Sequence, residues 1–390
     1  MDEITRHIRS RPARQQPEWH AAVPVEQVRA ELRSRPALIR AGDLWALRSL
    51  LSRVVDDEAQ VVQSGDCAED PEECTKGYIA RKAGLLDLLA GAMRMATHKP
   101  VVRVGRIAGQ FAKPRSSPTE RVGDLELPVF RGHMVNSPEP DPVSRQPDPR
   151  RMLDCYTAAA EAMEHLGWHE PEGQDAIGPR VWTSHEALLL DYEIPLTRRD
   201  EEGRLFISST HWPWIGERTN QVDGAHVALL AEVVNPVSLK VGPTMEPGTL
   251  LRLCERLDPH REKGRLTLIS RMGADTVLRR LPPLVAAVRA AGHPAIWLCD
   301  PMHGNTVTTG EGLKTRYLEV LQREIHNFQC AVRTQGGIAG GLHLETTPDE
   351  VTECCTTSAD EGRVGDKYTS FCDPRLNPHQ AISAISAWQG

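Results

Sequence analysis

Eight short apolar runs, each followed by a polar motif and most by a helical stretch, constrain the fold of this chain more than any other feature. Strands that alternate with helices form right-handed parallel βαβ units, and eight units predict a closed (β/α)8 barrel. A doubly wound open sheet is the alternative, and it would spread the motifs along one edge. The runs lie at residues 60–63, 101–104, 180–183, 205–215, 238–241, 265–269, 295–298 and 340–344.

Two further helical stretches, at residues 24–34 and 41–55, precede the first apolar run. Residues 1–22 carry arginines among prolines and glutamines, which predicts a loosely ordered arm. The length of 390 residues fits a barrel formed as one domain. We therefore predict an N-terminal arm with a helical extension over residues 1–58 and a barrel over residues 59–390.

Composition and charge limit the partners of the chain. The formal net charge of −7 argues against nucleic acid as the main partner, so an anionic ligand would need a local basic cluster. No apolar run approaches the roughly 18 residues of a membrane span, and the N-terminus does not resemble a signal peptide. We expect no membrane association and a cytoplasmic location. Nine cysteines, an odd number, fit reduced thiols or metal ligands better than a disulfide framework.

The segment RIAGQFAKPRS, residues 106–116, follows the second apolar run and concentrates basic side chains in a turn-rich stretch. Guanidinium groups such as those of Arg106 and Arg115 chelate phosphate oxygens in pairs, and Lys113 adds a point charge. Gly109 allows the backbone to approach a ligand closely. The segment is suited to binding phosphate, although on its own a solvated basic loop is an equal alternative.

Other reactive side chains occupy the same relative position, directly after the predicted strands. In a (β/α)8 barrel the carboxyl ends of the strands form the active face, so these residues are expected to converge there. Six cations in the neighbourhood, which include Arg218, Lys240 and Arg271, are enough for two phosphates or for a phosphate and a carboxylate. The residues after the strands are, in order, Cys67, Arg106, His185, Glu217, Arg218, Lys240, Arg271, His303 and Glu345.

Cys67, His303, Glu345 and Asp373 are a candidate set of metal ligands. Their spacing is too wide for a local zinc motif, and only a barrel would bring them together. A thiolate, an imidazole and two carboxylates suit a borderline divalent ion such as Mn, Co, Fe or Zn rather than Mg or Ca. Considered one at a time, Cys67 is also typical of a small core residue, and Asp373 before a proline is typical of a turn.

A set of strings along residues 60–380 resembles the type II 3-deoxy-D-arabino-heptulosonate 7-phosphate (DAHP) synthases. These enzymes begin the shikimate pathway. The resemblance implies a barrel that condenses phosphoenolpyruvate with erythrose 4-phosphate, using one divalent metal ion. The strings are SGDCAED, RIAGQFAKPRS, TSHEALLLDYE, GERT with DGAH, NPVSLKVGP, LISRMGA, CDPMHGNT, GGLHLE, VTEC and CDPRLN.

Carried over residue by residue, the resemblance assigns a role to each motif. The metal ligands are Cys67, His303, Glu345 and Asp373. The contacts to phosphoenolpyruvate are Arg106, Glu217, Arg218, Lys240 and Arg271, and the aldose phosphate would lie along Lys113, Pro114, Arg115 and Ser116. Metal-bound water, Lys113 and Glu217 are open alternatives for managing the protons, and Arg106, Lys113 and Glu217 are the candidate catalytic side chains.

Departures from the family pattern leave further alternatives open. Ser64 and Ser238 replace usual glycines, and the segment between residue 168 and the third predicted strand is short where larger members insert a helix pair. This shortening resembles synthases of secondary metabolism, such as antibiotic biosynthesis, and predicts weak feedback by aromatic amino acids. An amino analogue of the aldose phosphate as substrate, or a non-catalytic regulatory role, are the alternatives. The resemblance also predicts a homo-oligomer, whereas no residue indicates a chorismate mutase partner.

Overall fold

The computed structural model describes residues 3–19, 23–168 and 180–390. Within it the chain forms two compact units. The first unit comprises Met1–Leu44, Ala68–Ala80 and Ile107–Asn235, and the second comprises Trp45–Cys67, Arg81–Arg106 and Pro236–Gly390. No helix among the described residues is long and apolar enough to cross a membrane.

The second unit is built on six parallel strands in the order β2-β1-β14-β11-β10-β9. These strands are buried almost throughout, as expected for continuous Val-, Ile- and Leu-rich runs in a parallel sheet. The parallel sheet confirms the α/β class and a barrel-like arrangement, whereas closure of an eight-stranded barrel stays a prediction. The strands are β1 (Gln60–Gly65), β2 (Val101–Arg106), β9 (Val237–Val241), β10 (Leu266–Ser270), β11 (Ile296–Cys299) and β14 (Ile338–Glu345).

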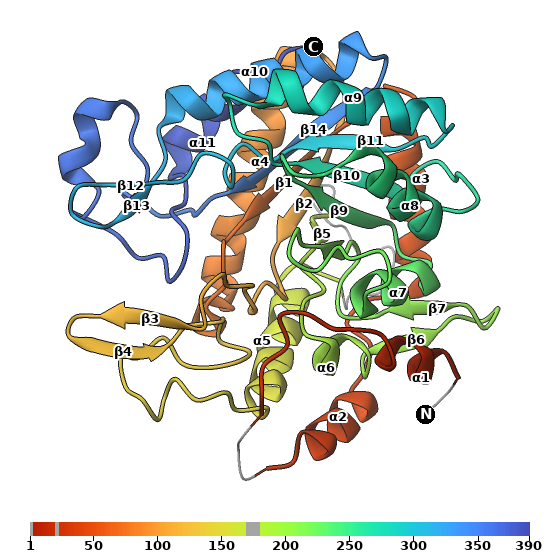
Figure 1. The fold of residues 1–390 in the computed structure, drawn as a ribbon, viewed down its shortest axis with the longest axis vertical. Coiled ribbons are helices and arrows are strands. Elements are labelled where there is room, and N and C mark those ends of the chain that lie inside the picture. The colour runs from red at the N-terminus through yellow and green to blue at the C-terminus, as the bar shows by residue number, and fades with distance from the viewer. Residues whose placement is uncertain (1–2, 20–22, 169–179) are drawn as a thin grey trace. The chain divides into compact units, whose positions relative to one another are not determined.

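Helices between these strands supply the connections that parallel strands require. Helix α9 packs against both α8 and α10, and α10 also contacts β14 and α11 (Figure 1). Two short strands, β12 and β13, form an antiparallel hairpin before α10. The elements are α8 (Pro247–Leu257), α9 (Val277–Ala290), β12 (Val307–Thr308), β13 (Lys314–Thr315), α10 (Leu318–Thr334), η2 (Ser358–Arg363) and α11 (Pro378–Ile385), while α3 (Ala41–Val55) and α4 (Lys76–Thr97) each run from the first unit into the second.

The first unit contains short helices, two hairpins and a parallel bridge. In the bridge, Trp214 N donates to His185 O at 3.0 Å and Ala187 N donates to Trp214 O at 2.9 Å, next to β5 and β8. The elements are α1 (Glu3–Arg9), α2 (Val25–Ser34), η1 (Pro71–Glu73), β3 (Thr119–Val122), β4 (Leu125–Pro128), α5 (Arg151–His165), β5 (Trp182–Thr183), α6 (Leu190–Glu193), β6 (Thr197–Arg199), β7 (Leu205–Ile207), β8 (Trp214–Ile215) and α7 (Ala225–Glu232).

The N-terminal arm is more ordered than its composition predicts. Helix α1 covers Glu3–Arg9, and the following residues make specific contacts within the first unit. Gln16 accepts from Leu190 N at 3.0 Å and donates to Leu188 O at 2.9 Å, while Trp19 Nε1 donates to Asp191 at 2.8 Å. The prediction of a loose arm is therefore wrong for the described residues of this stretch, because its polar side chains have partners more than a hundred residues away.

One other local prediction needs correction, and one local element was not predicted. The predicted run 205–215 is two strands, since Asn235 satisfies both Ile207 N (2.9 Å) and Ile207 O (3.0 Å) and ends β7 there. The proline-rich loop that precedes α5 contains the hairpin of β3 and β4, whose two-residue turn is Gly123 and Asp124. Gly123 has a φ of +60°, the left-handed conformation that such turns need.

Candidate active site

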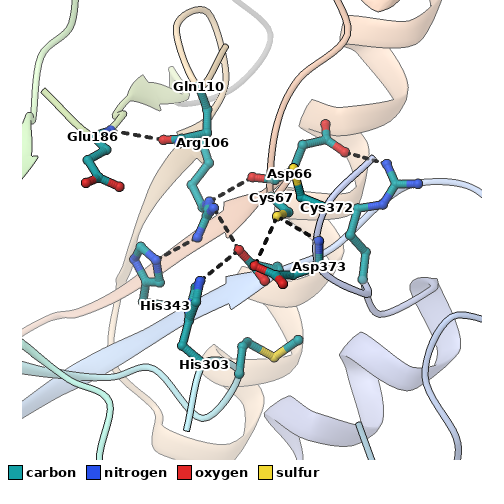
Figure 2. Close-up of polar contacts among 12 residues, drawn as sticks. Asp66, Cys67, Arg106, Gln110, Glu186, His303, His343, Cys372 and Asp373 are labelled. Carbon is teal, nitrogen blue, oxygen red and sulfur yellow. Dashed lines mark hydrogen bonds and ion pairs between the residues drawn. The ribbon is translucent and has the colours of Figure 1, made fainter. Parts of the chain in front are cut away.

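Three of the four predicted metal ligands lie together in the second unit, and the fourth adjoins them. Single donor atoms of Cys67, Glu345 and Asp373 all lie within 4.8 Å of one another. Cys67 Sγ is 3.7 Å from Asp373 Oδ2, and His303 Nε2 is 3.2 Å from Glu345 Oε1 (Figure 2). Residues far apart in the sequence therefore form one compact donor set, and their role as metal ligands stays a prediction.

The register of the parallel strands explains this convergence. Gly65 pairs with Glu345 on β14 and with Arg106 on β2, so the last residues of three neighbouring strands lie at one level. Cys67 follows Gly65 by two residues and emerges at the same edge. Carboxyl ends of parallel strands meet at one edge, and this edge carries the reactive side chains.

The donor set fits a borderline divalent ion. Cys67 and Glu345 are fully buried, and a buried thiol beside two carboxylates and an imidazole is suited to Mn, Co, Fe or Zn. His303 Nδ1 lies 2.8 Å from Asp300 Oδ2, so the carboxylate orients the ring with Nε2 toward Glu345. A carboxylate that holds the second nitrogen is the usual support of a metal-binding histidine.

Arg106 is bound from three sides at the same edge. Its guanidinium donates to Asp66 O at 3.0 Å, to His343 Nε2 at 2.7 Å and to Glu345 Oε1 at 3.1 Å (Figure 2). Because a guanidinium only donates, His343 Nε2 must accept, and its Nδ1 then donates to Gln63 Oε1 at 2.6 Å. Burial, together with the charges of Lys240 and Arg106, lowers the pKa of His343 well below its usual value, so this ring is neutral.

Lys240 and Arg271 belong to the same edge of the sheet. Lys240 is buried and pairs with Asp300, and burial lowers the pKa of the Lys240 ammonium. Burial opposes ionisation of Asp300, but His303 and Lys240 hold the pKa of that carboxyl well below its usual range. Arg271 Nη2 donates to His303 O at 3.2 Å. The second unit thus brings Arg106, Lys240 and Arg271 next to the metal-ligand candidates.

The remaining predicted substrate residues belong to the first unit. Arg218 donates to the Ser116 hydroxyl at 2.5 Å, which joins the GERT and KPRS motifs. Arg115 donates to Glu120 Oε2 and to Phe130 O. These residues are Lys113, Pro114, Arg115, Ser116, Glu217 and Arg218.

Glu69 shapes the loop that leads to Lys113, a role that the sequence reading missed. Its fully buried carboxylate accepts from three successive backbone N–H groups, those of Ala108 (3.1 Å), Gly109 (2.9 Å) and Gln110 (2.8 Å). Successive N–H groups that point at one anion form a backbone nest. Glu69 lies within the string SGDCAED, so the signal was present, but its partners are some forty residues away.

His185, expected at the reactive face, has a structural environment within the first unit. Its Nε2 lies 2.8 Å from Glu193 Oε1, and Ser209 donates to the other oxygen of Glu193 at 2.6 Å. All three side chains are buried. A Cβ on Gly109 would lie 2.0 Å from His185 Nδ1, so this glycine is required for packing against the ring. Separately, Glu186 N donates to Gln110 Oε1 at 3.0 Å (Figure 2).

Several residues that support the metal-ligand candidates were not singled out from the sequence. Arg316 is fully buried and donates to Glu345 Oε2 at 2.8 Å, and Lys314 Nζ lies 2.8 Å from Asp373 Oδ1. Arg375 bonds Asp66 Oδ1 at 2.7 Å. Arg375 lies within the quoted string CDPRLN, whereas Lys314 and Arg316 lie outside every quoted string. Even inside a motif, spacing alone does not distinguish a ligand from the side chain that orients it.

A parallel α/β fold with buried cations and a thiol–imidazole–carboxylate cluster at the strand ends is typical of an enzyme that acts on anionic substrates. The model of the Class-II DAHP synthetase family matches residues 3–176 and 161–386. The chain belongs to this family.

Individual relatives agree with the family match. The chain is 56% identical, over 100% of its length and 98% of the relative, to a probable phospho-2-dehydro-3-deoxyheptonate aldolase of Pseudomonas fluorescens. It is 38% identical to a phospho-2-dehydro-3-deoxyheptonate aldolase of Streptomyces coelicolor, over 96% of this chain and 94% of the relative. A solved structure of such an aldolase from Francisella tularensis matches with a TM-score of 0.54 at 13% identity, covering 96% of this chain and 99% of that one, a likeness of fold alone.

Proposed function

We propose that this chain condenses phosphoenolpyruvate with erythrose 4-phosphate and water to give DAHP and inorganic phosphate. C3 of the enol phosphate forms a bond to the aldehyde carbon, water adds at C2, and phosphate leaves. The observation that carries the proposal is the convergence of Cys67, Glu345 and Asp373 within 4.8 Å, with His303 beside them, in a member of this family. A divalent ion held by these four residues would supply Lewis acidity toward the aldehyde oxygen.

The cations of the second unit are suited to phosphoenolpyruvate. Arg106, Lys240 and Arg271 surround the ligand cluster through their contacts with Glu345, Asp300 and the His303 carbonyl. Fixed cations neutralise the phosphate and carboxylate of the substrate and orient the enol carbon for attack. Because carboxylates already hold the side chains of Arg106 and Lys240, little ordering is left to be done when the substrate binds.

The substrate roles of the residues in the first unit rest on the family resemblance. We assign the aldose phosphate to Lys113, Pro114, Arg115 and Ser116, and further phosphoenolpyruvate contacts to Glu217 and Arg218. The 2.5 Å bond between Arg218 and the Ser116 hydroxyl supports this assignment, since it links the two motifs. Lys113 and Glu217 are the side chains that we propose for proton transfer, with a water molecule as the alternative.

Cys67→Ala tests the metal centre, with Cys330→Ala as its matched control. Cys330 is an exposed cysteine on α10 of the same unit, so it controls for loss of a thiol. After chelation, we expect added Mn or Co to restore phosphate release to wild type and to Cys330→Ala but not to Cys67→Ala. Equal restoration in Cys67→Ala would contradict the proposed ligand set.

The proposed physiological role is supply of a secondary-metabolite route with weak aromatic feedback. This proposal rests on the short connection between α5 and β5, of which residues 169–179 lie outside the described part of the chain. We expect Phe, Tyr and Trp, alone or mixed, to leave the steady-state rate almost unchanged. Strong inhibition by any of them would contradict it. The homo-oligomer, the cytoplasmic location and the boundary at residue 58 likewise stay predictions.

A further inference from the structure

Glu353 occupies a position that the proposed chemistry does not use. It belongs to the VTECC segment, and its side chain is fully buried. Oε1 accepts from Thr369 N at 3.0 Å and from Ser370 N at 2.8 Å, and Oε2 accepts from Arg375 N at 2.7 Å. One carboxylate therefore binds three backbone N–H groups of a single loop, on both sides of Asp373.

The loop that Glu353 binds has no helix or strand between η2 and α11. Backbone hydrogen bonds hold it at Lys367 and Leu376, so side-chain contacts fix the shape of the stretch between these two points. Ser370 adds an internal contact, because its hydroxyl donates to Asp373 O at 2.6 Å. The backbone N of Asp373 in turn donates to Cys67 Sγ at 3.3 Å. Glu353 thus determines where the loop presents the Asp373 carboxylate to the other metal-ligand candidates.

A buried ionic chain continues from Glu353 to the end of β1. Arg375 Nη2 donates to Glu353 Oε1 at 2.9 Å, and Arg375 Nη1 donates to Asp66 Oδ1 at 2.7 Å. Lys82 Nζ lies 2.7 Å from the other oxygen of Asp66. Two carboxylates and two cations balance in charge, which a buried network requires. Asp66 directly precedes Cys67, so this network of ion pairs links the backbone next to Cys67 to the loop that carries Asp373.

We propose that Glu353 is a positioning residue for the metal centre, and that its negative charge sets metal affinity by holding the Asp373 loop. The proposal rests on the ligand set given above under the proposed function. An amide at this position would place an NH2 group against Arg375 or against the two loop N–H donors. Glutamine would keep the shape of the side chain. Backbone N–H groups on one side of the loop would lose their acceptor, and Arg375 would lose a negatively charged partner.

The test compares Glu353→Gln with Glu350→Gln. Glu350 lies three residues away and is exposed, and within the described part of the chain its polar contact is a distant one of 3.9 Å with His379. The dissociation constant for Mn²⁺ is measured by competition with a fluorescent chelator. We expect it to rise about 10- to 100-fold in Glu353→Gln, as for other residues that orient metal ligands, and to stay at the wild-type value in Glu350→Gln. At saturating Mn²⁺ we expect Glu353→Gln to recover most of the wild-type kcat.

Ser370→Ala keeps the test decisive if Glu353→Gln does not fold. Ser370 is half-buried, and loss of its hydroxyl removes the hydrogen bond to the Asp373 carbonyl and the one that Cys372 N donates to the hydroxyl at 3.2 Å. The Mn²⁺ dissociation constant should therefore rise about 3- to 10-fold without a change in Tm. Wild type that binds no Mn²⁺ would overturn the proposed metal centre itself. If wild type binds Mn²⁺ and the folded variants Glu353→Gln and Ser370→Ala bind it with the same affinity, the role of Glu353 alone is overturned.

Discussion

Replacing Glu324 by glutamine should change how the stability of the protein depends on pH. Glu324 lies on α10, is fully buried, accepts from Gly273 N at 2.9 Å and also bonds the Asn305 amide. Burial, reinforced by the negative charge of Asp300, raises the pKa of Glu324 to about 8. Glu324 holds together the loops that carry Arg271 and His303, so its ionisation acts on the candidate site as well as on stability.

The size of the effect follows from the shift. The pKa rises from 4.5 to about 8, which is about 3.5 units, and each unit corresponds to 1.36 kcal/mol. The native state holds the proton up to about pH 8, whereas the unfolded state loses it near 4.5, so stability is full below 4.5 and falls as pH rises. Between pH 5 and pH 8 the ionisation of Glu324 alone should lower the free energy of unfolding by about 3 to 4 kcal/mol.

Denaturant unfolding of wild type and Glu324→Gln at a series of pH values measures this contribution, because the other titrating groups cancel in the difference. The amide of Glu324→Gln lowers stability by the same amount at every pH, since its NH2 group faces the Asn305 donor. The test is therefore how the difference in stability between variant and wild type changes with pH. We expect the free energy of unfolding of Glu324→Gln, relative to that of wild type, to rise by a few kcal/mol from pH 5 to 8. A difference that does not change with pH would refute the reasoning.

Three further substitutions test other parts of the structure. A Cβ at Gly341 would lie 1.9 Å from Val61 O, so Gly341→Ala should destabilise the protein by about 3 kcal/mol or more, whereas Gly84→Ala, in an open helical position, should stabilise it slightly; chemical denaturation that ranks them otherwise would contradict the strand register. Gln15 accepts from Arg115 N at 2.9 Å, so Gln15→Ala should raise the KM for erythrose 4-phosphate about fivefold and leave the KM for phosphoenolpyruvate unchanged; an equal rise in both would count against this local role.

The sequence predicted the parallel strands and the proximity of the metal-ligand candidates because both depend on local signals. Continuous apolar runs marked the six strands of the second unit to within about two residues, and polar residues directly after a strand must share one edge of a parallel sheet. Cys67 and Glu345 were found in this way. Asp373 is different, because no strand directly precedes it and the rule for strand ends does not apply to it.

The supporting residues could not be predicted in the same way. Glu353 and Glu69 accept hydrogen bonds from backbone N–H groups of loops elsewhere in the sequence, and no sequence pattern predicts which loop a carboxylate will bind. The prediction of a loose N-terminal arm was wrong for the same reason, because Gln16 and Trp19 have partners in and beside α6. The β3–β4 hairpin had a readable signal, the Gly123-Asp124 turn between alternating residues, which its proline-rich surroundings obscured.

The most direct test of the account is the reaction itself. Chelated protein is supplied with phosphoenolpyruvate and erythrose 4-phosphate, with and without Mn or Co, and both inorganic phosphate and the heptulosonate product are measured. The account predicts metal-dependent release of phosphate in a one-to-one ratio with DAHP. Metal-loaded, folded protein that releases no phosphate from this pair, or that reaches the full rate with chelator present throughout, would contradict it.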